Sequence, residues 1–178
     1  MNENTVAGFG SQAGVVARPG YEETAGVPKF LYEVVCYDAD GTERWREDFT
    51  NLVTTAGKTD IVDKYFKGSA YTAAWYLGLK GTGTAAAGDT LASHATWAEV
   101  TPYSGNRPSI TFGTTSGGSN TASAVTYAIT GSATVAGAFI ASATSGTSGT
   151  LYSAGDFASS RSVVSGDSLQ VTVTVSVA

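Results

Sequence analysis

The chain has 178 residues, of which 14% are charged, and its formal net charge at pH 7 is −5. The length fits one domain whose core is large enough to fold without disulfides. The acidic balance argues against nucleic acid as a partner, because a nucleic-acid face needs clustered Lys and Arg to displace counterions. Cys36 is the only cysteine, so no internal disulfide forms, which fits folding in a reducing cytoplasm.

No membrane partner is expected either. Between Arg107 and Asp156 the sequence has no charged residue or histidine, which raises the question of a membrane segment. However, Ser, Thr and Gly interrupt every apolar run well before the roughly 20 residues that a spanning helix requires. The start, "MNENTVAGFG", has neither the basic region nor the apolar region of a secretion signal.

Residues 1–28 show little periodic apolar pattern, and we interpret them as an extended N-terminal arm before a β-sandwich domain of residues 29–178. For an isolated subunit the plainer interpretation is a disordered tail, and this alternative stays open. The arm carries apolar side chains of the kind found where a tail lies on a neighbouring protein. The candidate partner-binding residues are Phe9, Val15, Val16 and Tyr21.

A β-hairpin is predicted at the start of the domain. Residues 30–38 are β-branched and aromatic, as is typical of a strand. The Asp-Gly pair at 40–41 favours a tight turn into a second strand over 42–48, with Trp45 pointing into the core.

A short amphipathic helix is predicted at about residues 56–67, within "NLVTTAGKTDIVDKYFKG" (51–68). Thr54 or Thr55 can cap its start, and Gly68 can end it. Its apolar residues recur at the spacing of one helical face; they are Ile61, Val62, Tyr65 and Phe66. We expect this helix to close one end of a β core.

The rest of the chain predicts further strands, with a Gly/Ser/Thr-rich loop before the last. They cover 73–81, a segment near Trp97, 109–115, 122–130, 134–143 and 168–178. About eight strands with turn signals between them indicate an all-β antiparallel sandwich. A jelly roll is favoured over an up-and-down barrel, because the first and last strands lie at the chain ends with long connections between.

The sequence contains no convincing catalytic or ligand-binding motif. His94, the only histidine, has no G-x-S-x-G context near it. The string "GTGTAA" (81–86) is not followed by the apolar helix of a nucleotide-binding unit. "DADG" (38–41) lacks the other ligands of a calcium loop, and Asp156 and Asp167 sit in turn-like "AGD" and "SGD" settings. We expect no enzyme activity, no catalytic residues, no cofactor and no metal.

Three aromatic residues could stack on a sugar ring: Trp75, Trp97 and Tyr103. The more common role of such residues is in a core, and both interpretations stay open at this point.

Several blocks, taken in order, resemble a group of small virion structural proteins of tailed bacteriophages. The blocks are "NLVTTAG" (51–57), "WYLGL" (75–79), "AAGDTLASHATWAEVTPY" (86–103), "GTLYSAGDF" (149–157) and "SGDSLQVTVTV" (165–175). The resemblance covers about residues 30–178. It implies a virion component of the head or the tail, made in the host cytoplasm.

Small jelly-roll subunits of such phages often act as cement on the capsid exterior. The first hypothesis is therefore a capsid decoration protein that binds the major capsid protein and stabilises its lattice by multivalent contacts. Between residues 114 and 150, 30 of 37 residues are Gly, Ser, Thr or Ala, and such a sheet favours contacts with other copies as a dimer or trimer. The alternative is a tail or fibre module that binds host-surface carbohydrate through Trp75, Trp97 and Tyr103.

Overall fold

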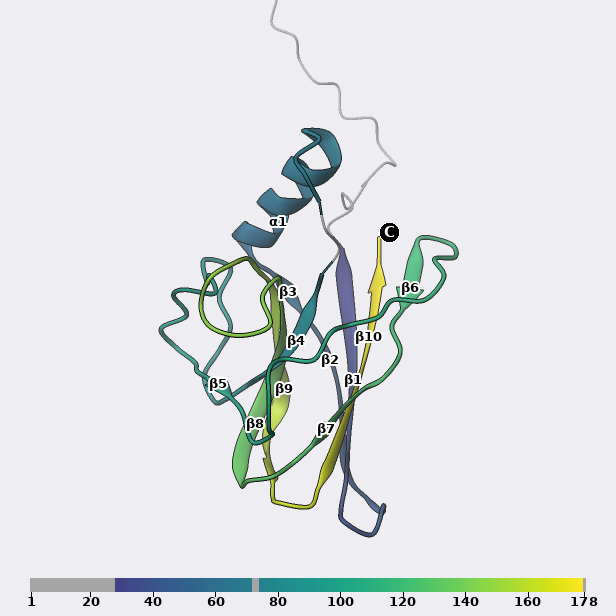
Figure 1. Ribbon diagram of the computed structural model, residues 1–178, viewed down its shortest axis with the longest axis vertical. Coiled ribbons are helices and arrows are strands. Elements are labelled where there is room, and N and C mark those ends of the chain that lie inside the picture. Colours follow the sequence, from purple (N-terminus) through teal and green to yellow (C-terminus); the bar gives the residue numbers. More distant parts are fainter. Residues whose placement is uncertain (1–27, 72–73, 178) are drawn as a thin grey trace, which may run out of the picture.

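The computed structural model describes residues 28–71 and 74–177, which form a sandwich of two antiparallel β-sheets with one short helical segment (Figure 1). The predicted all-β sandwich is thus confirmed, while the predicted arm lies almost entirely outside the described residues. The strands of the first sheet are β1 (Lys29–Tyr37), β2 (Glu43–Thr50), β6 (Ser119–Thr121), β7 (Val125–Ala128) and β10 (Ser168–Ser176). Those of the second are β3 (Leu52–Val53), β4 (Tyr76–Lys80), β5 (Glu99–Val100), β8 (Ala133–Ala141) and β9 (Leu151–Val163).

The first sheet is built around the pairing of β1 with β10. The two strands pair along their full length, from Lys29 opposite Ser176 to Tyr37 opposite Ser168. β2 follows β1 through the predicted hairpin, and β6 and β7 pair with successive parts of β10 on its other side. The alternating apolar pattern of β10 has the expected result, because Leu169, Val171 and Val173 are all buried.

The second sheet has the order β3-β9-β8-β4-β5, and its longest strand was missed by the sequence analysis. β9 has 13 residues, LYSAGDFASSRSV, where a loop was expected. The prediction was wrong because the first five residues of β9 are all buried, so polar and apolar residues do not alternate there. Small residues make this double-sided burial possible.

The prediction of a strand over residues 109–115 is also wrong. Only isolated bridges occur there, at Ser109 and Phe112. The strand expected near Trp97 exists as the two-residue β5, which pairs with β4.

The second sheet is covered on both faces, which gives the domain two apolar clusters. The main core lies between the sheets, and a smaller one contains Leu91, Trp97 and Phe139. Leu91 and Trp97 belong to the loop 81–98, and we call the sheet surface beneath this loop the covered face. Gly78 on β4 leaves room for the Phe139 ring, because a Cβ at that position would collide with it.

The helix starts and ends as predicted but buries a different face. It consists of α1 (Thr55–Ile61), which continues as a π-helical turn, η1 (Val62–Phe66). Thr54 accepts a hydrogen bond from the Gly57 backbone N–H at 3.0 Å, and Gly68 takes a positive φ of 73° after the end.

The predicted apolar face of the helix does not close the core. Ile61 packs against the main core. The side chains of Val62, Tyr65 and Phe66 are 55%, 81% and 75% exposed. The helix lies at the end of the sandwich where β10 ends, opposite the turn between β1 and β2, and projects beyond the sheets (Figure 1). No helix of the described residues is long and apolar enough to cross a membrane.

Candidate binding groove

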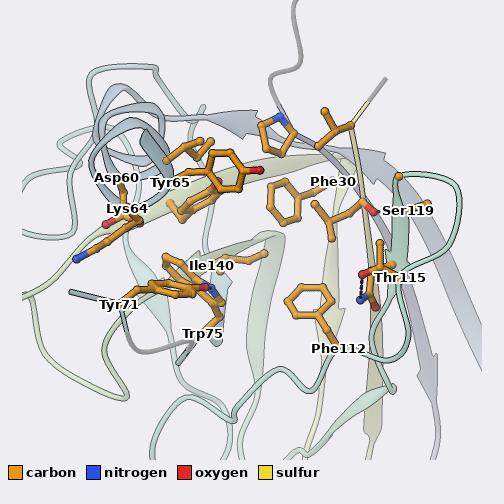
Figure 2. A pocket seen from close by; sticks show the side chains of 17 residues that line it. Phe30, Asp60, Lys64, Tyr65, Tyr71, Trp75, Phe112, Thr115, Ser119 and Ile140 are labelled. Atoms are coloured by element: carbon orange, nitrogen blue, oxygen red, sulfur yellow. Dashed lines mark hydrogen bonds between the residues drawn. The ribbon is translucent and has the colours of Figure 1, made fainter. Parts of the chain in front are cut away.

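An open groove of about 530 Å³ lies beside the helix, at the end of the sandwich (Figure 2). Side chains from both sheets and from the helix converge on it. Its lining residues are Pro28, Phe30, Asp60, Ile61, Lys64, Tyr65, Tyr71, Trp75, Phe112, Thr115, Gly118, Ser119, Asn120, Ile140, Tyr152, Val175 and Val177. We call this surface the groove.

Six of the 17 residues that line the groove are aromatic. Tyr152 on β9 packs edge-on against Trp75, with ring centroids 4.8 Å apart, and against Phe30 of β1 at 5.6 Å. The indole N–H of Trp75 donates to the Tyr71 hydroxyl at 3.2 Å. Such aromatic faces and edges are suited to binding apolar faces of a ligand.

Polar groups stand at the margin of the groove. Asp60 and Lys64 reach it from the helix, and Thr115 and Ser119 reach it from the opposite side (Figure 2). The Asn120 amide donates to the Thr115 hydroxyl at 2.8 Å, which fixes its orientation. An apolar wall with a few polar groups at its edge is the usual composition of a small-molecule site.

The helix is fixed to β9, and this positions its side of the groove. The Thr54 hydroxyl donates to the Leu151 carbonyl at 2.5 Å, in addition to capping the helix. Gly57 lies directly on the Tyr152 carbonyl, and a Cβ at this position would collide with it. Only glycine allows the helix to approach the strand this closely.

Tyr152 remains a neutral phenol under ordinary conditions. Burial raises its pKa above the usual value, and the negative charge of Asp60 adds to the effect. Its ring therefore supplies an uncharged surface to the groove.

The three predicted sugar-stacking residues do not come together. Trp75 lines the groove and is half-buried. Trp97 is only 5% exposed, and Tyr103 is 8% exposed beside a second, smaller hollow. The prediction that these three residues form one stacking site is wrong, because Trp97 and Tyr103 are buried in the interior.

The surroundings of Trp97 explain its burial. Its ring stacks on His94 with centroids 4.0 Å apart, and its indole N–H donates to the Asp89 carboxylate at 2.8 Å. The Lys80 ammonium lies 5.5 Å from the ring centroid. His94 thus has a packing partner inside the loop 81–98.

Tyr103 is tilted against Tyr127, with ring centroids 4.7 Å apart. Burial raises the pKa of Tyr103 to about 12, and the charge of Glu99 contributes to this rise. A phenol in these surroundings is a core residue.

Other candidate residues have structural partners. Asp38 accepts backbone hydrogen bonds from Asp40 at 3.0 Å and Thr42 at 2.9 Å, so "DADG" is a turn. The turn expected at Asp156 is wrong, because Asp156 lies within β9. Its carboxylate pairs with the buried Lys80 ammonium at 2.8 Å. Asp167 pairs with Arg44 at 2.5 Å. Within the part of the chain that the structure describes, no group of three or more His, Cys, Asp or Glu could hold a metal ion.

The candidate arm residues Phe9, Val15, Val16 and Tyr21 lie outside the described residues. No binding role was predicted for Phe30, Tyr71, Phe112 or Tyr152, although all four line the groove. Phe30 and Tyr152 begin their strands, and Tyr71 and Phe112 lie in connections, so no local pattern links them. Their meeting depends on the pairing of distant strands.

Comparison with known proteins gives one family. No curated protein and no solved structure matches the chain. A family model described as "Podophage GP4 fiber I protein gp80" matches residues 52–176, which include the helix, β3 to β10 and most of the groove. The chain therefore belongs to the podophage GP4 fiber I protein gp80 family and is a structural protein of a phage virion.

Proposed function

We propose that the protein is a fibre component of the virion that binds host-surface carbohydrate in the groove, without catalysing a reaction. The family description supports a fibre role over the capsid decoration that the sequence analysis placed first. The observation that carries the carbohydrate proposal is the open aromatic wall of Trp75, Tyr71 and Tyr65 with polar groups at its margin. An aromatic ring can bind the C–H face of a sugar, while Asp60 and Lys64 can bind its hydroxyls.

The groups at the groove favour binding over catalysis. A glycosidase of the usual kind needs two carboxyl groups facing one cleft. Among the described residues that line the groove, Asp60 is the only carboxylate. A weak single site is sufficient for a fibre, because several copies on one virion raise the overall avidity by about 10² to 10⁴.

The test is binding of the purified protein to a panel of immobilised bacterial surface polysaccharides. Trp75→Ala should abolish binding, and Trp75→Phe, which keeps an aromatic face, should retain most of it. Both variants should melt within a few degrees of the parent protein. Unchanged binding of Trp75→Ala would contradict the proposal.

The capsid decoration hypothesis differs from this proposal in copy number. Quantitative gels of purified virions should show a dozen or fewer copies for a fibre at the tail and hundreds for a decoration protein. Binding to the major capsid protein remains a prediction that belongs to the decoration role. So does a dimeric or trimeric state of this chain. Hundreds of copies would favour that role over the fibre.

A further inference from the structure

The end of the helix exposes an apolar surface that no described residue covers. We call Val62, Tyr65 and Phe66 the helix-tip patch; their exposed fractions are 55%, 81% and 75%. The Tyr65 and Phe66 rings pack edge-on at 5.0 Å, so they form one continuous surface. Large apolar side chains gathered in this way mark a contact site.

The chain outside the described residues starts close to this patch. Pro28, the first described residue, and Tyr65 both line the groove, so the described chain begins at the groove that the helix borders. Residues 21–27 can extend over roughly 23 Å, at about 3.3 Å per residue. The 12 residues of α1 and η1 span roughly 18 Å at 1.5 Å per residue. The segment 21–27 is therefore long enough to reach the far end of the helix.

The chemistry of this segment matches the patch. Tyr21 supplies an aromatic ring, and Glu22 and Glu23 follow it directly. Near the patch the helix presents Lys64 and Lys67, and the Lys67 side chain is 72% exposed, with Asp63 3.6 Å from its ammonium group. An acidic pair beside an aromatic residue is complementary to basic residues beside an aromatic pair.

We propose that residues 21–27 bind to the helix-tip patch of their own chain, with Tyr21 on Val62 and Phe66 and with Glu22 and Glu23 facing Lys64 and Lys67. The segment of the same chain is favoured over that of another copy, because a short tether gives an effective concentration in the millimolar range. This proposal does not depend on carbohydrate binding in the groove.

Disulfide trapping in the full chain tests the proposal. Cys36 is buried and can be replaced by Ser, so that Tyr21→Cys with Phe66→Cys is the only reactive pair. The matched control combines Tyr21→Cys with Asp40→Cys, in the turn at the opposite end of the sandwich (Figure 1). We expect the first pair to form a disulfide within the monomer under mild oxidation and the control pair to stay reduced.

Three results would overturn the proposal: no disulfide in either pair, equal formation in both pairs, or formation of disulfide-linked dimers, which would place the segment on a neighbouring copy. A second measurement does not require cysteines. Phe66→Ser should speed cleavage after Glu22 and Glu23 by a Glu-specific protease about tenfold, the change that 1.4 kcal/mol produces. Thr59→Ala, on the exposed side of α1, should leave the rate unchanged. An unchanged rate in Phe66→Ser would argue against the contact.

Discussion

Trp75 and Trp97 have the same side chain but opposite surroundings. Trp75 stands at the edge of the groove and donates to the Tyr71 hydroxyl, at a position that a ligand can reach. Trp97 is covered by its own loop and donates to the Asp89 carboxylate. Both indoles satisfy their N–H donors, so hydrogen bonding does not distinguish them. The difference is whether another segment covers the ring.

The two regions also differ in how charge is used. At the covered face the Lys80 ammonium is fully buried and pairs with Asp156, while nearby Arg107 makes two hydrogen bonds to Glu99, at 2.7 and 2.6 Å. At the groove the charged residues, Asp60 and Lys64, remain at the margin. At the covered face two buried cations thus pair with partly exposed carboxylates, whereas the groove is left open.

The largest expected effect comes from removing the covered indole. Trp97→Ala should destabilise the domain by about 3–5 kcal/mol, because it leaves a cavity beneath the loop and removes one of the two hydrogen bonds to Asp89. Trp75→Ala should cost clearly less, because its ring is only half-buried. Urea unfolding followed by circular dichroism measures both. Equal losses would show that the two sites do not differ as described.

The ion pair at the covered face gives the second prediction. Asp156→Ala should lower the free energy of unfolding by about 3 kcal/mol, because the buried Lys80 ammonium keeps its hydrogen bonds to the Gly81 and Gly83 carbonyls but loses its counter-charge. The double variant Lys80→Met with Asp156→Ala should recover a large part of this loss. Urea unfolding checks both variants. If Asp156→Ala alone costs less than about 1 kcal/mol, the pair does not hold this face closed.

Much of the first sheet could be predicted from sequence, because its pattern is local. The Asp-Gly turn after β1 and the alternation of β10 indicate a hairpin and a half-buried strand without knowledge of the rest. β9 could not be predicted, because its small residues are buried on both faces and carry no period of two. The helix start could be predicted from the pair Thr54 and Thr55, because a cap acts within the same turn, and Thr54 is the residue that caps.

No groove was predicted from the sequence, and Trp75 is the one residue of its lining that was given a binding role. Trp75 could be chosen because Trp is a common binding residue, but this preference selects Trp97 equally well. The pattern of the helix shows where Val62, Tyr65 and Phe66 lie around its axis, yet it contains no information on whether another segment covers them. Exposure depends on tertiary contacts that residues distant in sequence make.

The third prediction concerns the contact between the helix and β9, which holds one side of the open groove in place. In an ordinary helix Gly→Ala stabilises by about 1 kcal/mol. Gly57→Ala should instead destabilise by about 2 kcal/mol, because the added methyl group collides with the Tyr152 carbonyl. Gly88→Ala is the matched control, since no atom lies within 4 Å of its added Cβ. Thermal unfolding that shows a gain for Gly57→Ala would contradict this placement of the helix.

The smallest effect is expected at the start of the helix. Thr54→Ala removes both the cap to the Gly57 backbone N–H and the hydrogen bond to the Leu151 carbonyl, and should cost about 1 kcal/mol. Thr54→Ser keeps the hydroxyl and should remain close to the parent protein in urea unfolding. Because the helix carries Asp60, Lys64 and Tyr65 to the groove, Thr54→Ala should also weaken ligand binding there while leaving the surroundings of Trp97 unchanged. An equal change in the near-ultraviolet circular dichroism on adding Thr54→Ala to Trp75→Phe and to Trp97→Phe would mean that the groove and the covered face do not respond independently.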